Sequence, residues 1–133
     1  MDTKKLIEQA YAAFNSRNVD SALNLMAENV SWPKASEGGR VVGRDEIRSY
    51  WSRQWETFDP RVYVLEIEDV GNGRANVKVH QLVKDLDGNV LSDTEVWHEY
   101  TIKDGLIERM DIREDENNSG GGQSAAFAKH SNQ

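Results

Sequence analysis

The sequence predicts an α+β domain in which three N-terminal helices precede an antiparallel sheet. Two observations predict this class. The first half of the chain carries apolar residues at helical spacing, and the second half carries alternating strand patterns separated by turn pairs such as Asp87-Gly88 and Asp104-Gly105. Helices followed by consecutive strands are typical of α+β proteins. A length of 133 residues suits one domain with one core.

Three stretches have the apolar spacing of helices. The first begins near Asp2 or Thr3, which can cap it, and its stripe is Leu6, Ile7, Ala10, Tyr11 and Phe14. After Asn15–Asn18, a short second helix is predicted to carry Val19, Ala22, Leu23 and Met26. The third stripe comprises Ile47, Tyr50, Trp51, Trp55 and Phe58, and we expect Asp59-Pro60 to end that helix.

The strands begin with a short segment before the third helix. Val30-Ser31-Trp32 is stopped by Pro33, which cannot donate to a sheet, and a brief Val41-Val42 segment follows. Four longer strands are predicted at residues 61–70, 74–84, 90–102 and 106–113. Turns at Gly71-Asn72-Gly73, Asp87-Gly88 and Asp104-Gly105 make them three successive hairpins. We expect a single domain over residues 1–115 and a flexible tail over 116–133.

Composition excludes several functional classes. The net charge is −7 and the Lys and Arg residues are scattered, which argues against nucleic acid as a partner. No signal peptide or membrane span is predicted, so the expected location is cytoplasmic, with no membrane partner. The sequence has no cysteine, no His spacing typical of a metal site and no phosphate-binding loop, so we predict neither a metal nor a cofactor.

The strand at 90–102 supplies the first candidate site residue. One face carries Val96, His98, Tyr100 and Ile102, and it is the more apolar face, so we expect it to point inward. An inward His98 can act as a general acid or base, or donate a hydrogen bond to a ligand carbonyl. The alternative is a structural histidine whose polar atoms are satisfied by a neighbouring tyrosine or backbone group.

Aromatic residues supply the other candidates. Tyr50, Trp51 and Trp55 on the third helix offer flat apolar surface that suits a ring-shaped ligand. Trp32 and Met110 are predicted to line the same space, together with Tyr100. The alternative is that this stripe is ordinary core packing.

The order of several segments resembles the SnoaL-like group of the nuclear transport factor two-like superfamily, which includes polyketide cyclases and relatives of ketosteroid isomerase. The segments that carry the resemblance are Tyr11–Asn15, Val19–Leu23, Met26–Val30, Val42–Arg48 and His98–Ile112. The resemblance implies a curved sheet forming a cone-shaped half-barrel around an apolar pocket. It also implies a homodimer that meets through the convex sheet face, where His80, Leu82 and Trp97 are expected.

The resemblance does not extend to the catalytic residues of ketosteroid isomerase. The position of its general base falls at or beside Trp32, and the position of its late-strand acid falls on His98. The position of its first-helix tyrosine falls on Ala10. Tyr11 is one step away, a rotation of about 100°, so we expect it to point elsewhere. Steroid isomerisation by that mechanism is therefore not expected.

Similarity to the cyclases implies a different pair of catalytic residues, His98 and Asp111. The spacing from Gly105 to Asp111 is one residue shorter than in the cyclase pattern, and one residue on a strand changes the face. Two alternatives stay open: an inward Asp111 that pairs with His98 for an aldol-type ring closure, or an outward Asp111 that pairs with Arg109 or Arg113.

The sequence thus predicts a SnoaL-like small-molecule pocket protein with a small apolar ligand. One hypothesis is an enzyme with acid–base chemistry of the isomerase, cyclase or lyase type, transferring a proton on an apolar cyclic carbonyl compound. The second is a non-catalytic ligand-binding or accessory dimeric domain. The third is an interaction module whose pocket is residual. The identity of the ligand is not encoded in any motif that we find.

Overall fold

The protein, seen in a computed structural model, is described here over residues 2–114. Helix α1 spans Thr3–Asn15 and begins at Asp2, whose carboxylate accepts a hydrogen bond from the Lys5 N–H at 2.8 Å. Helix α2 spans Val19–Leu23 and is capped in the same way by Asn18. Helix α3 spans Arg44–Trp55, with two acidic residues in its first turn.

Over residues 2–114 the sheet has six strands, in the order β2-β1-β6-β5-β4-β3. Their bounds are Met26–Pro33 for β1, Arg40–Val42 for β2, Phe58–Gly71 for β3, Arg74–Asp85 for β4, Val90–Lys103 for β5 and Leu106–Glu114 for β6. The three predicted hairpins are confirmed, and β1 pairs antiparallel with β2. The pairing of β1 with β6 is the parallel one.

The turn between β5 and β6 shows why these hairpins were predictable. Asp104 and Gly105 both have positive φ, 54° and 78°. A two-residue loop with two positive φ angles twists in the same sense as the strands that it joins, and Asp-Gly tolerates that conformation. The turn therefore fixes the register of β5 on β6, which decides which residues of both strands face inward.

Two predicted element boundaries are wrong. Met26, expected in the second helix, is the first residue of β1, because Leu25 already accepts a hydrogen bond from the Ile107 N–H of β6. Phe58, expected on the third helix, begins β3, where it pairs with Asp85. Pro60 therefore lies inside a strand. The sheet tolerates it because β3 is an edge strand of the sheet formed by residues 2–114.

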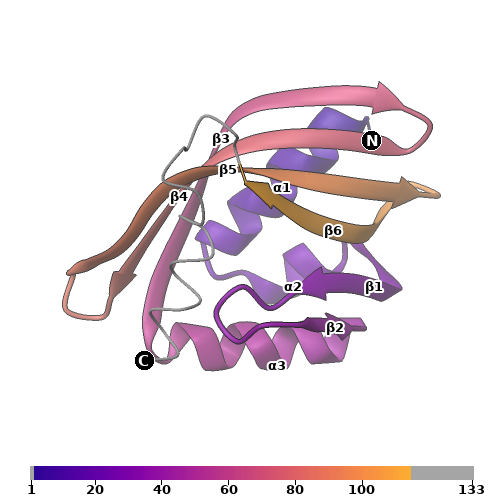
Figure 1. Ribbon diagram of the computed structural model, residues 1–133. Helices are drawn as coiled ribbons and strands as arrows, with labels where there is room; N and C mark the ends of the chain where they lie inside the picture. The colour runs from indigo at the N-terminus through magenta and orange to yellow at the C-terminus, as the bar shows by residue number, and fades with distance from the viewer. Residues whose placement is uncertain (1, 115–133) are drawn as a thin grey trace.

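The sheet curves around α1, and α3 runs along the side of β2 and β1 (Figure 1). Buried apolar residues of α1 meet the inner faces of β4 and β5, where Val77, Val79 and Val96 are fully buried. The predicted α+β class, with a curved and unclosed sheet and three N-terminal helices, is confirmed. The tail predicted at 116–133 lies outside the described residues. Within residues 2–114, no helix is long and apolar enough to cross a bilayer.

Candidate ligand pocket

A cavity of about 80 Å³ lies between α1, α3 and the concave face of the sheet. Its walls come from every layer of the fold. The lining residues are Ala10, Tyr11, Phe14, Met26, Trp32, Pro33, Ala35, Tyr50, Trp51, Gln54, Pro60, Val62, Gln81, His98, Tyr100, Met110 and Ile112. Ligand sites in proteins more often hold several hundred Å³, so side chains of the wall must move aside for a ligand larger than a single ring.

Three polar side chains form a hydrogen-bonded chain in this apolar space. The Tyr100 hydroxyl donates to the Tyr11 hydroxyl at 2.7 Å, and the Tyr11 hydroxyl lies 2.6 Å from Nδ1 of His98. Tyr11 comes from α1, whereas His98 and Tyr100 are two residues apart on β5 and therefore share its inner face. We call these three residues the relay.

The proton directions in the relay follow from counting donors. Tyr100 uses its one proton on Tyr11, so the single proton of Tyr11 is free to be donated to Nδ1 of His98. With the Tyr100 proton donated to Tyr11, the other tautomer, in which Nδ1–H of His98 donates to Tyr11, leaves the Tyr11 proton without an acceptor in the relay. Neutral His98 therefore carries its own proton on Nε2, which has no hydrogen-bond partner among residues 2–114. Because His98 lines the cavity, that N–H can be donated to a ligand.

Burial keeps all three groups neutral. His98 is 5% exposed, and desolvation lowers its pKa from 6.5 to about 4. Desolvation is also the largest cause that raises the pKa of Tyr11 and that of Tyr100 above the usual value for tyrosine. At neutral pH the relay is thus a set of uncharged donors and acceptors.

The wall next to the relay is aromatic, and the Trp32 ring meets the Tyr100 ring edge-on at a centroid distance of 6.3 Å. Trp51 from α3 makes edge-on contacts with Trp32 of β1 and Phe14 of α1, with ring centroids 5.8 and 5.1 Å apart. Tyr50 also lines the cavity, and its hydroxyl accepts a hydrogen bond from the Ser36 N–H at 3.2 Å, which ties the loop between β1 and β2 to α3. Flat rings beside a polar relay suit a planar ligand with an oxygen atom at its edge.

The cavity lining is uncharged. Of the described residues, no Asp, Glu, Lys or Arg contributes to it. Its other polar groups are the indole N–H groups of Trp32 and Trp51 and the side-chain amides of Gln54, in the last turn of α3, and Gln81, on β4. No group of His, Asp or Glu side chains within residues 2–114 has the arrangement of a metal site.

Six of the eight residues named from the sequence as site residues line the cavity: Trp32, Tyr50, Trp51, His98, Tyr100 and Met110. Trp55 does not. Its ring packs against Phe14 and Trp51, behind the wall, at centroid distances of 5.6 and 5.8 Å. The guanidinium of Arg17 covers the Trp55 ring at 5.0 Å.

Asp111 is not brought together with His98. In the register of β5 and β6, His98 is opposite Ile112 and Asp111 is opposite Glu99, so Asp111 lies on the outer face. Its carboxylate pairs with Arg109 at 2.8 Å and with Arg40 at 3.0 Å. The hydrogen bond from Arg109 is the largest cause that lowers the Asp111 pKa. The inward Asp111–His98 pair that the resemblance implied is therefore not formed.

Tyr11 corrects another expectation. Similarity to ketosteroid isomerase suggested that Tyr11 points elsewhere, yet it lines the cavity and is 7% exposed. Helix α1 lies inside a curved sheet, so it buries a wide stripe that includes both Ala10 and Tyr11. The spacing of Ile7, Tyr11 and Phe14 at i, i+4 and i+7 is the sequence signal that identifies it.

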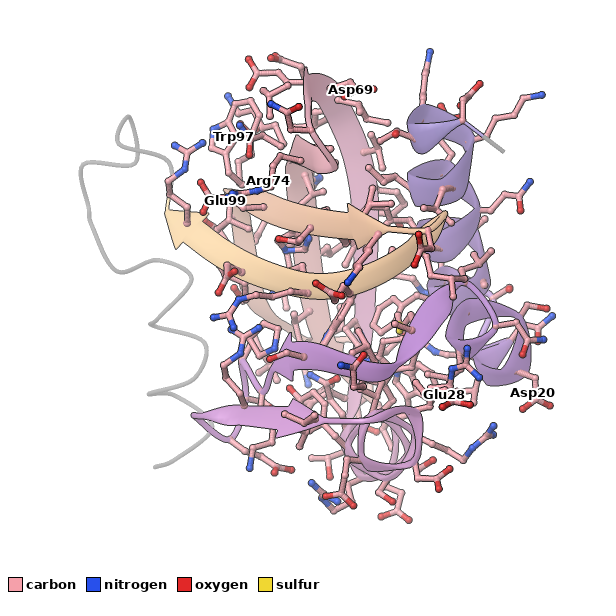
Figure 2. The ribbon with its side chains drawn as sticks, turned by 90° about the vertical axis from the view of Figure 1, so that its right-hand side faces the viewer. Asp20, Glu28, Asp69, Arg74, Trp97 and Glu99 are labelled. Carbon is pink, nitrogen blue, oxygen red and sulfur yellow. The ribbon has the colours of Figure 1, made fainter. Side chains whose placement is uncertain are left out.

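The residues expected on the convex face lie there. His80, Leu82 and Trp97 occupy outward positions of β4 and β5, opposite in register to Tyr63, Arg61 and Lys78. Figure 2 shows Trp97, Glu99 and Arg74 on the side of the sheet away from α1. The Arg113 guanidinium lies over the Trp97 ring at 5.3 Å and pairs with Glu99 at 2.8 Å.

The chain matches a known protein family over most of its length. The profile of the SnoaL-like domain matches residues 7–110, which include the relay and most of the cavity lining. This protein belongs to the SnoaL-like family. A search of curated proteins found no match.

Solved structures share this fold at low sequence identity. The crystal structure of TerC co-crystallised with polyporic acid is 22% identical, covers 91% of this chain and 96% of its own, and has a TM-score of 0.73. A putative polyketide cyclase from Pseudomonas putida KT2440 is 18% identical, with coverages of 90% and 96% and a TM-score of 0.74. An NTF2-like protein of unknown function from Burkholderia pseudomallei is 19% identical, with coverages of 87% and 92% and a TM-score of 0.74.

Proposed function

We propose that this protein binds a small, uncharged, cyclic carbonyl compound and promotes proton transfer on it. The observation that carries the proposal is the relay, which ends in the Nε2–H of a neutral imidazole at the surface of an uncharged cavity. A donor in a water-poor site favours the charge that develops on a carbonyl oxygen during enolisation. That one structural neighbour was crystallised with polyporic acid supports a small-molecule role for this fold.

The relay suits proton transfer as well as binding. As Nε2–H gives its proton to the carbonyl oxygen, Nδ1 can take the proton that Tyr11 donates, and Tyr100 can donate to Tyr11 in turn. The ligand becomes an enol. Water takes the α-carbon proton, because no carboxylate within residues 2–114 borders the cavity, and a proton returns from water to the Tyr100 oxygen, so that the relay is neutral again. Enolisation of this kind is the step shared by isomerase and cyclase chemistry.

The experiment measures exchange and binding separately. 4-Phenylcyclohexanone is incubated with the protein in D2O near neutral pD, and loss of its α-proton signals is followed by NMR. Binding is measured by calorimetry. We expect His98→Gln to bind the ketone within a few-fold of the wild type, because glutamine can also donate and accept. Its exchange rate should fall about a hundredfold, because an amide cannot relay a proton.

A second function is favoured by one observation, the lack of a carboxylate among the described residues that border the cavity. A site without a strong base can bind a carbonyl compound without turning it over. In that case the wild type binds 4-phenylcyclohexanone, and the rate of α-proton exchange equals that of the buffer. No binding of any cyclic ketone would contradict both functions.

We also propose that two copies of the chain meet through the convex sheet face. The support is the outward position of Leu82 and Trp97 and the exposure of Tyr63 and Leu65 on neighbouring β3, 47% and 51%. Light scattering coupled to size exclusion measures the mass directly. A monomeric wild type would contradict the proposal, and Trp97→Glu should turn a dimer into a monomer.

A further inference from the structure

The two glutamine amides in the cavity have no role in the relay. Gln54 is 9% exposed, and Gln81 is half-buried at an inward position of β4. Neither side-chain amide has a hydrogen-bond partner among residues 2–114, although both border the cavity. A side-chain amide that borders a cavity and has no protein partner can donate to and accept from a ligand there.

Both amides lie at the same end of the cavity. Gln54 is in the last turn of α3, four residues before β3 begins at Phe58, and Pro60 and Val62 of β3 also line the cavity. Gln81 is opposite Val62 in the register of β3 and β4. The end of α3 and the start of β3 therefore bring Gln54 and Gln81 to one polar end.

The relay lies at the other end. His98 is opposite Val77 on β4, and Gln81 is four residues further along that strand. Four residues of a strand span about 13 Å, so the two polar ends are separated by the length of an elongated molecule rather than of a single ring. Apolar rings and methyl-bearing side chains line the space between them.

We propose that Gln54 and Gln81 are the second hydrogen-bonding end of the ligand site. The ligand is then elongated and uncharged, with a carbonyl group at the relay and a hydroxyl or amide group at the two glutamines. This inference rests on the proposed function for the carbonyl end and adds the far end. A glutamine amide both donates and accepts, so it matches a hydroxyl group, which does the same.

Two ketones that differ only at the far end test this inference in the wild-type protein. The probes are 4-phenylcyclohexanone and 4-(4-hydroxyphenyl)cyclohexanone, and calorimetry gives both dissociation constants. We expect the hydroxylated ketone to bind about tenfold tighter, because its hydroxyl can pair with a side-chain amide that has no protein partner. Equal affinities would overturn the inference and leave the carbonyl proposal standing. If neither ketone binds, both proposals are overturned.

Variants identify the groups responsible. Gln54→Leu and Gln81→Leu should each remove severalfold of the advantage of the hydroxylated ketone and leave 4-phenylcyclohexanone bound as well as before or better. Gln9→Leu makes the same change on the exposed side of α1 and should alter neither affinity. Equal weakening of both ketones by the two cavity variants would overturn the assignment. Thermal unfolding checks that each variant is folded, and the comparison in the wild type decides the question if one is not.

A third probe tests the absence of charge. 4-(4-Oxocyclohexyl)benzoic acid places a carboxylate where the hydroxyl would lie. It should bind at least tenfold more weakly than the hydroxylated ketone, because the described cavity lining has no cation to offset its desolvation. Tighter binding of the acid would overturn the uncharged ligand class and would direct attention to Arg17, whose guanidinium lies 5.6 Å from the Phe14 ring.

Discussion

The two faces of β5 place the same kinds of atoms in opposite surroundings. On the inner face, His98 and Tyr100 are almost fully buried, uncharged and joined to Tyr11 by hydrogen bonds. On the outer face, Trp97 and Glu99 are partly exposed and contact Arg113. A polar group on the inner face that loses its hydrogen-bond partner stays unpaired, because water has little access to it. On the outer face, water can replace a lost partner. A change at an inner position should therefore cost much more than a similar change outside.

The largest expected effect is the pH dependence that His98 confers. Above pH 6.5 His98 is neutral in both the folded and the unfolded chain. Below pH 6.5 the unfolded chain takes up a proton, and the folded chain does not until its pKa of about 4 is reached. The folded state should lose about 3 kcal/mol from this group between pH 6.5 and pH 4.

Urea unfolding of the wild type and of His98→Gln at pH 7 and pH 4.5 isolates that contribution. Carboxylates titrate in both proteins, so the difference between the two pH profiles reports His98. A wild-type profile no steeper than that of His98→Gln would show that the imidazole is not kept neutral by burial.

The second effect concerns the centre of the relay. Tyr11→Phe removes one hydroxyl but leaves two buried groups, the Tyr100 hydroxyl and Nδ1 of His98, without their partner. We expect a loss of about 2 kcal/mol in the free energy of unfolding. Tyr63→Phe is the matched control on the outer face, where the tyrosine is 47% exposed, and should change stability by less than about 0.5 kcal/mol. Equal losses would remove the distinction between the two faces.

The smallest effect is expected at Asp111. Asp111→Asn weakens ion pairs with Arg40 and Arg109 on the outer face, and such partly exposed pairs contribute less than about 1 kcal/mol. Ketone affinity and α-proton exchange should stay at wild-type values. A loss of exchange with unchanged stability would mean that Asp111 reaches the ligand and that the role implied by similarity to the cyclases is right.

Local rules predicted most of this fold. The Asp104-Gly105 turn pair and the alternation along β5 were enough to predict that His98, Tyr100 and Met110 lie inside. The positive φ angles of that pair agree with the predicted turn. Helix ends were harder, because Met26 and Phe58 are apolar and fit a helical stripe, while their strand pairing depends on residues far along the chain.

The site was predictable in its aromatic part and less so in its polar part. A stripe of large aromatic residues predicts a buried wall. Glutamine is usually exposed, so the local sequence around Gln54 or Gln81 does not predict that either side chain lines a cavity. Tyr11 was misplaced because a single helical step was taken to turn it away from the pocket, whereas a curved sheet buries a broad stripe of the helix within it. Asp111 differs from Tyr11, because the family pattern suggested it for the site and its position in the strand register places it on the outer face of the sheet.

The most direct test of the relay is the nitrogen-15 NMR spectrum of the His98 ring, recorded with and without 4-phenylcyclohexanone. We predict a neutral ring at pH 7 with the proton on Nε2, no titration between pH 5.5 and pH 8, and a shift of the Nε2 signal when the ketone is added. A charged ring, a proton on Nδ1, or signals that the ketone leaves unchanged while it binds would contradict a relay that ends in a donor facing the ligand.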